Sequence, residues 1–349
     1  MSLPKTTKAW VIHGTDPSKG FDNLKLEEVP VEELGESPGG EIDADCTRDL
    51  FIPQGAYPFP LKPPIIACSD GAGKVIAVGK KVTEFSVGDK VVTSFYQGHQ
   101  YGDITEPATA SGLGGGLHGT LRHYGVFPQN GLALAPSNLT PTGAGTLSCA
   151  ALTAWNALYG LASKAIKPGS VVLTQGTGGV SLAAIQLARA AGAIVIATTS
   201  SDEKVKRLEQ LGANIVINYK KDPHWGKTAK RLSPRKEGAD HVIEVGGPGT
   251  MEQSMKAVKL EGVIDVIGFL AGPKADNEPS ALESLRHCFM IRGILVGSRA
   301  QLQQMNRAIE ANAIDIVVDE KIFNFEDAKE AYKYQWDQKN FGKVVIKLD

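Results

Sequence analysis

A short glycine-rich segment, Gly176-Thr177-Gly178-Gly179, follows the apolar run 170–174 and precedes the helix-like run 180–191. Glycines at 176 and 178 permit a tight turn and let the backbone approach a ligand closely. The first N–H groups of the helix, from Gly179 and Val180 onward, attract phosphate oxygens. A strand, a glycine turn and a helix in this order predict a dinucleotide site. A glycine-rich turn without a ligand is the alternative, because Ser181 stands at the third glycine position.

The residues after the next strand-like run, 193–198, bear on which dinucleotide binds. An NAD site usually places Asp or Glu at the tip of this strand, against the 2′-hydroxyl of the ribose. Here the tip carries Ser200 and Ser201, whose hydroxyls can hold a 2′-phosphate together with Lys204. This pattern favours NADPH. Asp202-Glu203 follow directly, so NADH remains the alternative, and Lys204 is otherwise an ordinary surface lysine.

Charge and cysteine usage exclude several classes of partner. The chain has 37 basic and 38 acidic residues and a net charge of −1, which argues against nucleic acid or an anionic membrane. Its four cysteines include no CxxC pair, so neither a disulfide framework nor a zinc knuckle is predicted. The first residues lack the apolar core of a signal peptide, and no apolar run could span a bilayer. We therefore expect a cytoplasmic protein with reduced thiols.

The organisation of the sequence changes near residue 136. Residues 1–135 are rich in Gly and Pro, with short β-type runs at 74–78 and 90–95 between turn residues, which is typical of a small barrel or sandwich. After a helix-like run at 144–161, strand-like and helix-like runs alternate. This alternation predicts right-handed crossovers and an α/β fold, a doubly wound parallel sheet with helices on both faces. A helix at 325–333 and a strand at 342–346 end the chain.

Four segments, taken together, carry a specific resemblance to a known family: 54–58 (QGAYP), 68–75 (CSDGAGKV), 87–91 (VGDKV) and 147–155 (LSCAALTAW). Over nearly its whole length the chain resembles the medium-chain dehydrogenase/reductases. It is most similar to their zinc-independent quinone oxidoreductase-like (zinc-type alcohol dehydrogenase-like) branch, with fungal features. The resemblance implies a GroES-like β-barrel catalytic domain made from residues 1–135 and 300–349. It also implies a Rossmann dinucleotide-binding domain at 136–299, with the active site in the cleft between the two.

The resemblance further implies cofactor contacts for residues at matching positions. They are Lys204 and Tyr219 at the 2′-phosphate, Gly246 and Phe269 on the nicotinamide side, Gly342 and Lys343 in the returning tail, and Thr153 in the matched helix. From the residues alone, Tyr219 is equally a strand-end aromatic, and Gly246-Gly247-Pro248 equally a turn.

Zinc is the next question that the resemblance raises. In zinc-dependent members, a Cys, a His and a second Cys bind catalytic zinc, and a four-cysteine loop binds structural zinc. Cys46 and Cys149 match the thiolate positions, but Ser69 stands at the His position, and serine is a poor neutral ligand. Residues 94–120 contain no cysteine, so the structural site is absent. We expect no metal; the alternative is a catalytic site completed by His99, His118 or His123.

Candidate catalytic residues follow from what a metal-free hydride transfer requires. The nicotinamide carries the hard chemistry, while the protein orients the acceptor and stabilises the resulting anion. A hydrogen-bond donor and a proton source are therefore useful. Tyr57 is the first candidate, with packing in a Tyr-Pro turn as its alternative, and Cys46, Thr47 and Arg48 are weaker ones. The segment 40–49 is most of a strand shorter than in the family, and Cys46 replaces its Asn, so an impaired first domain is an open alternative.

The sequence thus predicts NADPH-dependent reduction of a quinone or an α,β-unsaturated carbonyl by zinc-free hydride transfer. The alternatives are an alcohol dehydrogenase, with or without zinc, and a weakly catalytic NADPH-binding protein. The strand-like run 290–296 is expected at the edge of the sheet, where apolar strands are usually paired. The resemblance implies pairing of this edge across a homodimer. We expect the residues that select the substrate to lie in loops such as 96–118.

Overall fold

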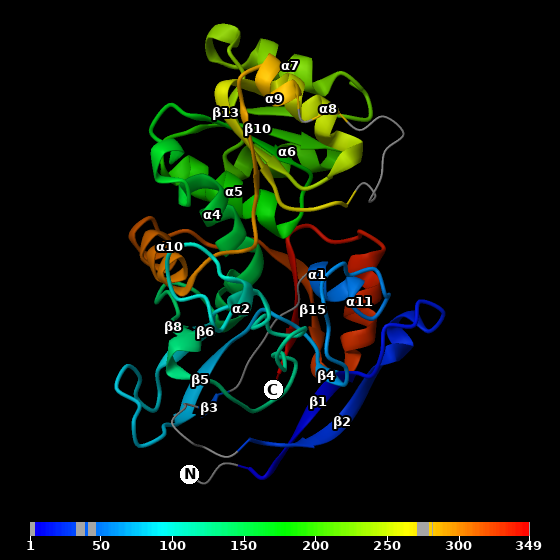
Figure 1. Ribbon diagram of the computed structural model, residues 1–349, viewed down its shortest axis with the longest axis vertical. Helices are drawn as coiled ribbons and strands as arrows, with labels where there is room; N and C mark the ends of the chain where they lie inside the picture. The colour runs from blue at the N-terminus through cyan, green and yellow to red at the C-terminus, as the bar shows by residue number, and fades with distance from the viewer. Residues whose placement is uncertain (1–3, 33–38, 41–46, 271–278, 281, 349) are drawn as a thin grey trace. The chain divides into compact units, whose positions relative to one another are not determined.

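The computed structural model describes residues 4–32, 39–40, 47–270, 279–280 and 282–348. Figure 1 shows the two compact units of the chain, one formed by Met1–Leu152 with Gly297–Asp349 and the other by Thr153–Val296. We expected the boundaries after residues 135 and 299. Residues 136–152 instead belong to the first unit, because Ser148 hydrogen-bonds to Thr93 (3.3 Å) and the Cys149 N–H donates to Asp70 (2.5 Å).

The second unit is built on a six-stranded parallel sheet in the order β11-β10-β9-β12-β13-β14. In chain order this is 3-2-1-4-5-6, the arrangement of dinucleotide-binding sheets. The predicted doubly wound α/β fold is therefore confirmed. The strands are β9 (Val171–Gln175), β10 (Ile194–Thr199), β11 (Ile215–Asn218), β12 (Ala239–Glu244), β13 (Val258–Val266) and β14 (Met290–Gly293).

Helices cover both faces of this sheet (Figure 1). The helix α5 packs with α6, and α7 packs with α8. Ala183, Ala184 and Ala188 are buried, and their small side chains let α5 approach the sheet closely. The helices are α4 (Leu152–Tyr159), α5 (Gly179–Ala190), α6 (Val205–Leu211), α7 (Trp225–Leu232), α8 (Pro248–Ala257) and α9 (Glu283–Arg286).

The first unit consists mainly of short strands, as expected for a small barrel-like domain. They form three sheets, β2-β1-β4, β7-β3-β5-β6-β8 and β15-β16. The strands are β1 (Thr6–Ile12), β2 (Leu24–Pro30), β3 (Gly39–Gly40), β4 (Ile65–Ile66), β5 (Ala72–Ala77), β6 (Lys90–Thr93), β7 (Gly125–Val126), β8 (Leu132–Leu134), β15 (Val318–Asn324) and β16 (Lys343–Lys347). The helices are α1 (Thr47–Phe51), α2 (Glu106–Thr109), α3 (Pro141–Ala144), α10 (Arg299–Ala311) and α11 (Ala328–Trp336).

Both ends of the chain share the hydrophobic core of the first unit. Trp10 and Ile12 from β1 lie in one buried cluster with Tyr332 from α11 and Val344 from β16. The indole N–H of Trp10 donates to the carbonyl of Phe325 at 2.7 Å. The returning tail is therefore part of the first unit, and it carries Lys343 into that unit.

The helix predicted over 144–161 is interrupted. It consists of α3, a π-helical turn at Leu147–Ala151, and α4. The N–H of Cys149, inside the π turn, donates to the carboxylate of Asp70. Such turns frequently occur at functional sites. This one positions Cys149 against Asp70, a contact that helical periodicity alone does not predict.

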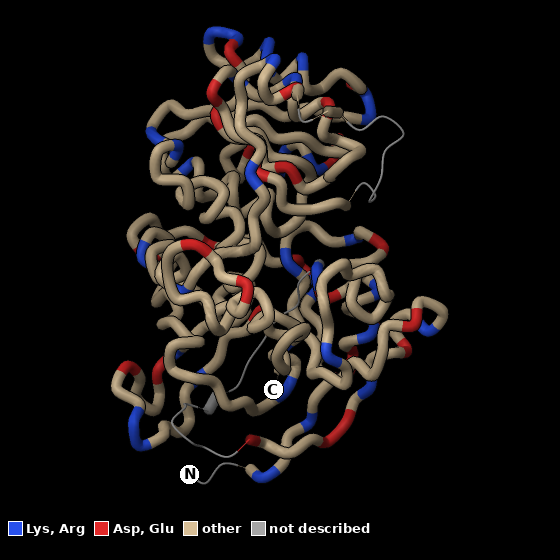
Figure 2. Tube along the Cα trace, viewed as in Figure 1, with Lys and Arg blue, Asp and Glu red and all other residues tan. Residues whose placement is uncertain are grey.

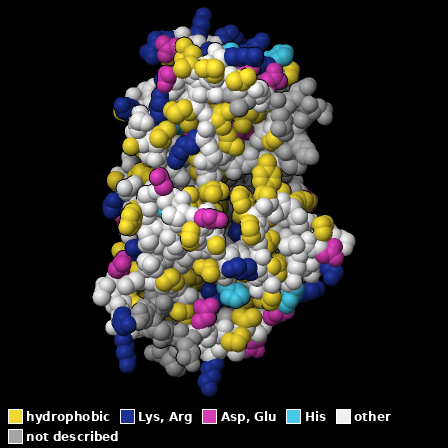
Figure 3. Space-filling view, viewed as in Figure 1, with side chains coloured by type: hydrophobic (Ala, Val, Ile, Leu, Met, Phe, Trp, Pro, Cys, Tyr) yellow, Lys and Arg dark blue, Asp and Glu magenta, His cyan; other side chains and the backbone are white. Residues whose placement is uncertain are grey.

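Figure 2 shows acidic and basic residues interspersed on both units, and the face drawn in Figure 3 mixes apolar with polar side chains. Within the part of the chain that the structure describes, no helix combines the length and apolarity needed to cross a membrane.

Candidate functional site

The glycine turn in the second unit has the geometry that a phosphate site requires. Gly176 has a φ of +72°, in the left-handed region that favours glycine. A Cβ atom added to Gly176 or Gly178 would meet nothing within 4 Å, so open space borders the backbone there. Gly178 is the N-cap of α5, which begins at Gly179 and continues through Val180. The N–H groups of this helix end are thus available to phosphate oxygens.

Ser181 explains how the turn forms without a third glycine. Its side chain is buried, and its hydroxyl donates to the carbonyl of Gln175 at 2.6 Å. Serine therefore closes the turn from inside, without occupying the open space beside Gly176.

Two charged residues that follow the tip of β10, Asp202 and Lys204, have different hydrogen-bond partners. The ammonium of Lys204 lies 3.2 Å from the hydroxyl of Thr177 in the glycine turn. Asp202 is bound instead by Lys221 and by Asn218 (2.7 Å), which lower the pKa of its carboxyl. The lysine therefore lies on the turn, while the carboxylate is held by residues at and beyond the end of β11.

The other residues predicted near the 2′-phosphate lie in the same region of the second unit. Ser200 and Ser201 are half-buried, and the N–H of Ser201 donates to the hydroxyl of Thr199. Tyr219 follows β11, is 40% exposed, and its N–H donates to the carbonyl of Thr199 at 3.0 Å. The structure thus brings Tyr219 to the tip of β10, beside the two serines.

The loops after β12 and β13 pack tightly against each other. Gly246 and Gly247 follow Glu244, the last residue of β12, and donate their N–H groups to its carboxylate. A Cβ on Gly247 would lie 2.8 Å from the Cα of Phe269. The predicted nicotinamide-side residues Gly246 and Phe269 are therefore held close together. Thr153, also predicted to contact the cofactor, is buried in α4 at the start of this unit.

Arg48 is the centre of a separate cluster in the first unit. One guanidinium nitrogen donates to the Leu113 carbonyl (2.6 Å) and lies 3.1 Å from Asp49. The guanidinium carbon lies 4.7 Å from the ring centroid of Tyr57 and 5.1 Å from that of Phe95. Such contacts fix a planar cation in one orientation. The sequence candidates Tyr57 and Arg48 are thus neighbours.

Burial and charge act together in this cluster. Burial alone would lower the pKa of Arg48, but Asp49 and Tyr57 raise it above its ordinary value. Burial raises the pKa of the Tyr57 hydroxyl, although Arg48 opposes that effect. Burial likewise raises the pKa of Tyr96. Cys149 is close enough to Arg48 and to both tyrosines to contribute to the electrostatic environment of each.

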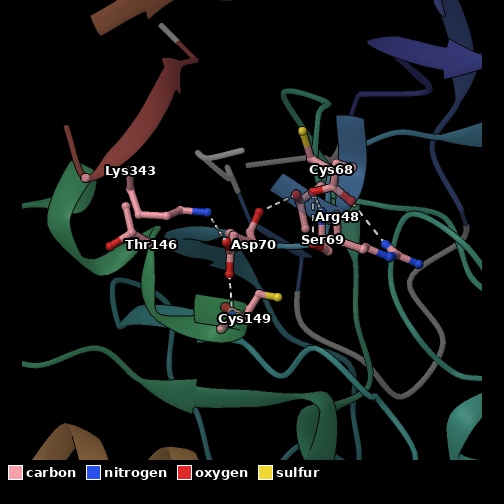
Figure 4. A network of polar contacts seen from close by, with 12 residues as sticks. Arg48, Cys68, Ser69, Asp70, Thr146, Cys149 and Lys343 are labelled. Atoms are coloured by element: carbon pink, nitrogen blue, oxygen red, sulfur yellow. Dashed lines mark hydrogen bonds and ion pairs between the residues drawn. The ribbon is translucent and has the colours of Figure 1, made fainter. Parts of the chain in front are cut away.

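Lys343 is buried, and its side chain points toward Asp70 in the network of Figure 4, which also contains Arg48 and Cys149. Its ammonium lies 2.7 Å from Oδ2 of Asp70, whose Oδ1 accepts the N–H of Cys149. Gly342 precedes it with a φ of +91°, and a Cβ there would lie 2.6 Å from the carbonyl oxygen of Val317. The Lys343 side chain, which we expected at the cofactor, thus makes an ion pair inside the first unit. Any cofactor contact of Lys343 remains a prediction.

The described residues do not fit a zinc ion. The Ser69 hydroxyl and N–H both donate to Asp49 Oδ2, at 2.9 and 3.0 Å. Within the ranges given above, no group of three or more His, Cys, Asp or Glu side chains could hold a metal. The fixed positive charge of Arg48 near Cys149 would also repel a cation. Cys46, which we considered as a ligand and as a catalytic residue, lies outside the described residues, as does most of the segment 40–49.

The three histidines named above as alternative zinc ligands make other contacts. His99 pairs through Nε2 with the Gly102 carbonyl at 3.0 Å. Nδ1 of His118 accepts the N–H of Ile66 at 3.1 Å, and the ring of His123 packs edge-to-face against that of Phe325, with the ring centroids 4.3 Å apart.

Sequence reasoning missed two buried acids, Asp70 and Glu244. Asp70 lies two residues after the apolar run 65–68 and immediately before Gly71, and Glu244 ends the strand-like run 241–244, two residues before Gly246-Gly247. An acid in that position is a usable signal, because a buried carboxylate needs several donors and glycine lets backbone N–H groups supply them.

Comparison with known proteins identifies the family. Residues 43–137 match the alcohol dehydrogenase GroES-like domain, and residues 179–311 match the zinc-binding dehydrogenase domain. A zinc-type alcohol dehydrogenase-like protein of Schizosaccharomyces pombe is 43% identical, over 97% of this chain and 99% of its own. An acryloyl-coenzyme A reductase of Sulfurisphaera tokodaii is 28% identical, over 97% and 99%. The crystal structure of an NAD-dependent alcohol dehydrogenase superposes with a TM-score of 0.85 at 29% identity, covering 98% of this chain and 100% of that one.

These matches extend over both units, and the S. pombe relative aligns almost end to end. They agree with the 3-2-1-4-5-6 sheet and with the barrel-like first unit. The chain therefore belongs to the medium-chain dehydrogenase/reductase superfamily, whose members are oxidoreductases that bind a nicotinamide cofactor.

Proposed function

We propose that this protein is an NADPH-dependent reductase of a quinone or an α,β-unsaturated carbonyl that works without zinc. The observation that carries the proposal is the partly buried guanidinium of Arg48, fixed by Asp49 and Leu113 beside the hydroxyl-bearing ring of Tyr57. It provides a positive charge and a hydrogen-bond donor in a region where the described residues do not fit a metal.

The chemistry assigns a role to each of the two side chains. When bound, NADPH supplies the hydride. An acceptor reduced in this way gains a negative charge on its oxygen, as an enolate or a hydroquinone anion. Arg48 would stabilise that charge, because donors fixed in a water-poor site need no reorganisation. Tyr57 would donate a hydrogen bond and then a proton, since burial keeps its hydroxyl protonated at high pH.

The second unit supplies the residues that would hold the cofactor. The turn at Gly176, Gly178, Gly179 and Val180 would bind the pyrophosphate at the start of α5. Lys204, with the hydroxyls at the tip of β10, would bind the 2′-phosphate. The contacts of Asp202 with Asn218 and Lys221 support NADPH over NADH, because a carboxylate next to the ribose would repel the 2′-phosphate.

Alcohol oxidation is the second candidate, favoured by the name of the S. pombe relative and by that of the NAD-dependent structure. The S. tokodaii relative is named an acryloyl-coenzyme A reductase, which favours reduction of a carbon–carbon double bond next to a carbonyl. We give the reductase precedence, because alcohol oxidation in zinc-dependent members needs a metal that the described residues do not fit.

We also infer a homodimer that pairs β14 with its copy. This strand is the edge of the six-stranded sheet, and Ile291 is 43% exposed. Exposed apolar edge strands are usually covered. Light scattering after gel filtration should give twice the chain mass, and Ile291→Lys should give a monomer. A wild-type monomer would contradict the inference.

One experiment separates the candidate functions. The purified full chain is mixed with NADPH or NADH and a panel of quinones, enals and enones, and cofactor absorbance is followed. The reverse reaction is tested with NADP⁺ or NAD⁺ and a panel of alcohols. Consumption of NADPH with a quinone or enal is the expected result. Alcohol-dependent reduction alone would favour the second candidate, and binding of NADPH without turnover would indicate a cofactor-binding protein of little activity.

A further inference from the structure

Glu244 is a buried carboxylate at the carboxyl end of β12 with an unusual set of donors. It is 0% exposed. Its Oε1 accepts the N–H groups of Gly246 (2.8 Å) and Gly247 (2.9 Å) and the hydroxyl of Thr250 (2.5 Å). Its Oε2 accepts the amide of Gln175 (2.8 Å) and the hydroxyl of Ser254. Five donors thus converge on one carboxylate, which has about four lone-pair positions to offer.

Gln175 connects this carboxylate to the glycine turn. It is the last residue of β9 and immediately precedes Gly176. While its Nε2 donates to Glu244, its Oε1 accepts the N–H groups of Val245 and Gly246, both at 3.2 Å. The Gln175 carbonyl also accepts the hydroxyl of Ser181 inside the turn. The ends of β9 and β12 are therefore tied together by side chains as well as by the sheet.

Close packing extends this connection to the next loop. A Cβ on Gly246 would collide with the side chain of Thr250, and one on Gly247 would lie 2.8 Å from Phe269. The backbone of Gly246-Gly247 thus has little room to move as long as Glu244 holds its N–H groups. A change at Glu244 would be transmitted to Gly246 and Phe269 through these contacts.

We propose that Glu244 is a positioning residue, which fixes the Gly246-Gly247 loop, and through it Phe269, for the nicotinamide half of the cofactor. The inference rests on the proposed function, because it takes from that proposal the side of the cofactor that these loops bind. The carboxylate of Glu244 is surrounded by its five donors, and we do not assign it a ligand contact of its own. Its effect on binding is therefore expected only through the loop it holds.

The test compares two ligands on the full chain, by fluorescence titration and calorimetry: NADPH, and 2′-phospho-ADP-ribose, which lacks the nicotinamide. Glu244→Gln keeps the shape but places an NH₂ group against at least one donor, so a buried donor loses its partner. We expect the Kd for NADPH to rise about tenfold, while the Kd for the fragment changes less than about twofold. Thr250→Val removes one donor and should raise the NADPH Kd by a smaller factor; it also tests the proposal if Glu244→Gln does not fold.

Asp265→Asn is the matched control. Asp265 is another 0% exposed carboxylate of the same sheet, bonded to His241 and near Arg292. It should lower Tm at least as much as Glu244→Gln, with both ligand affinities unchanged. Unaltered NADPH binding by Glu244→Gln, or equal weakening of both ligands, would overturn the positioning role and leave the proposed function intact. A wild-type chain that binds neither NADPH nor NADH would instead refute the proposed function.

Discussion

The ammonium of Lys343, in the C-terminal strand, lies 2.7 Å from the carboxylate of Asp70, and both side chains are buried. Burial raises the pKa of Asp70, while Lys343 opposes that effect. Because Asp70 also accepts the N–H of Cys149, this ion pair connects the end of the chain to the π turn beside the Arg48 cluster.

Removing the lysine should destabilise the first unit strongly. Lys343→Met leaves the buried Asp70 carboxylate without its cation, and the expected loss is about 3 kcal/mol in the free energy of unfolding. The double variant Lys343→Met/Asp70→Asn should recover much of that loss, because no uncompensated charge remains. Denaturant unfolding measures both. Lys339→Ala, at a position exposed to solvent where the lysine pairs with Asp337, is the control and should change stability by less than about 0.5 kcal/mol.

Tyr57 is expected to act as a proton donor. Tyr57→Phe should lower kcat with a quinone or enal by about 100-fold and leave the Kd for NADPH unchanged. Because burial raises the pKa of Tyr57, its hydroxyl stays protonated as pH passes the ordinary tyrosine range. Wild-type activity should therefore persist to higher pH than a solvent-exposed phenol would allow. Tyr101→Phe, at a position 79% exposed, should have no effect, and equal loss in both variants would remove the assigned role.

Lys204 should determine the preference between the two nicotinamide cofactors. Lys204→Ala is expected to raise the Kd for NADPH about tenfold and to leave that for NADH within about twofold, since only NADPH carries the 2′-phosphate. Lys206→Ala, at an exposed position of α6, is the matched control. If Lys204→Ala weakened NADH and NADPH equally, Lys204 would not bind the 2′-phosphate.

The buried pair His241 and Asp265 should make the second unit sensitive to pH. Burial alone would lower the pKa of His241, but its bond to Asp265 (2.8 Å) outweighs burial and raises it. A raised folded-state pKa contributes stability that is fully present below the unfolded pKa of about 6.5 and is lost as pH rises through the folded value. The Tm should therefore fall over that range of pH. His241→Gln should flatten the dependence, and a profile that stays unchanged in this variant would exclude His241 as its source.

The local order of elements could be predicted from the sequence, while contacts between distant residues could not. The strand at 170–174, the turn at Gly176 and the helix of α5 depend on neighbouring residues, so they were predictable. Asp70 and Lys343 are 273 residues apart, and no local pattern links them. The direction of the Asp202 side chain depends on Asn218 and Lys221, which belong to another β–α segment.

The break in the predicted 144–161 helix has the same cause. Helical periodicity continues through the segment, but Asp70 accepts the N–H of Cys149 and a π turn forms there. Glu244 was missed because a single acid at the end of a strand-like run does not reveal a buried carboxylate. That conclusion requires knowledge of its hydrogen-bond donors, among them Gln175 and Ser254.

The most direct test of zinc-free, NADPH-dependent reduction is turnover on a sample of known metal content. The purified chain is treated with a chelator, its zinc is counted by mass spectrometry, and NADPH consumption with a quinone or enal is measured on the same sample. We predict full activity at far less than one zinc per chain and no gain when zinc is added back. Loss of activity on chelation, restored by one zinc per chain, would contradict this prediction.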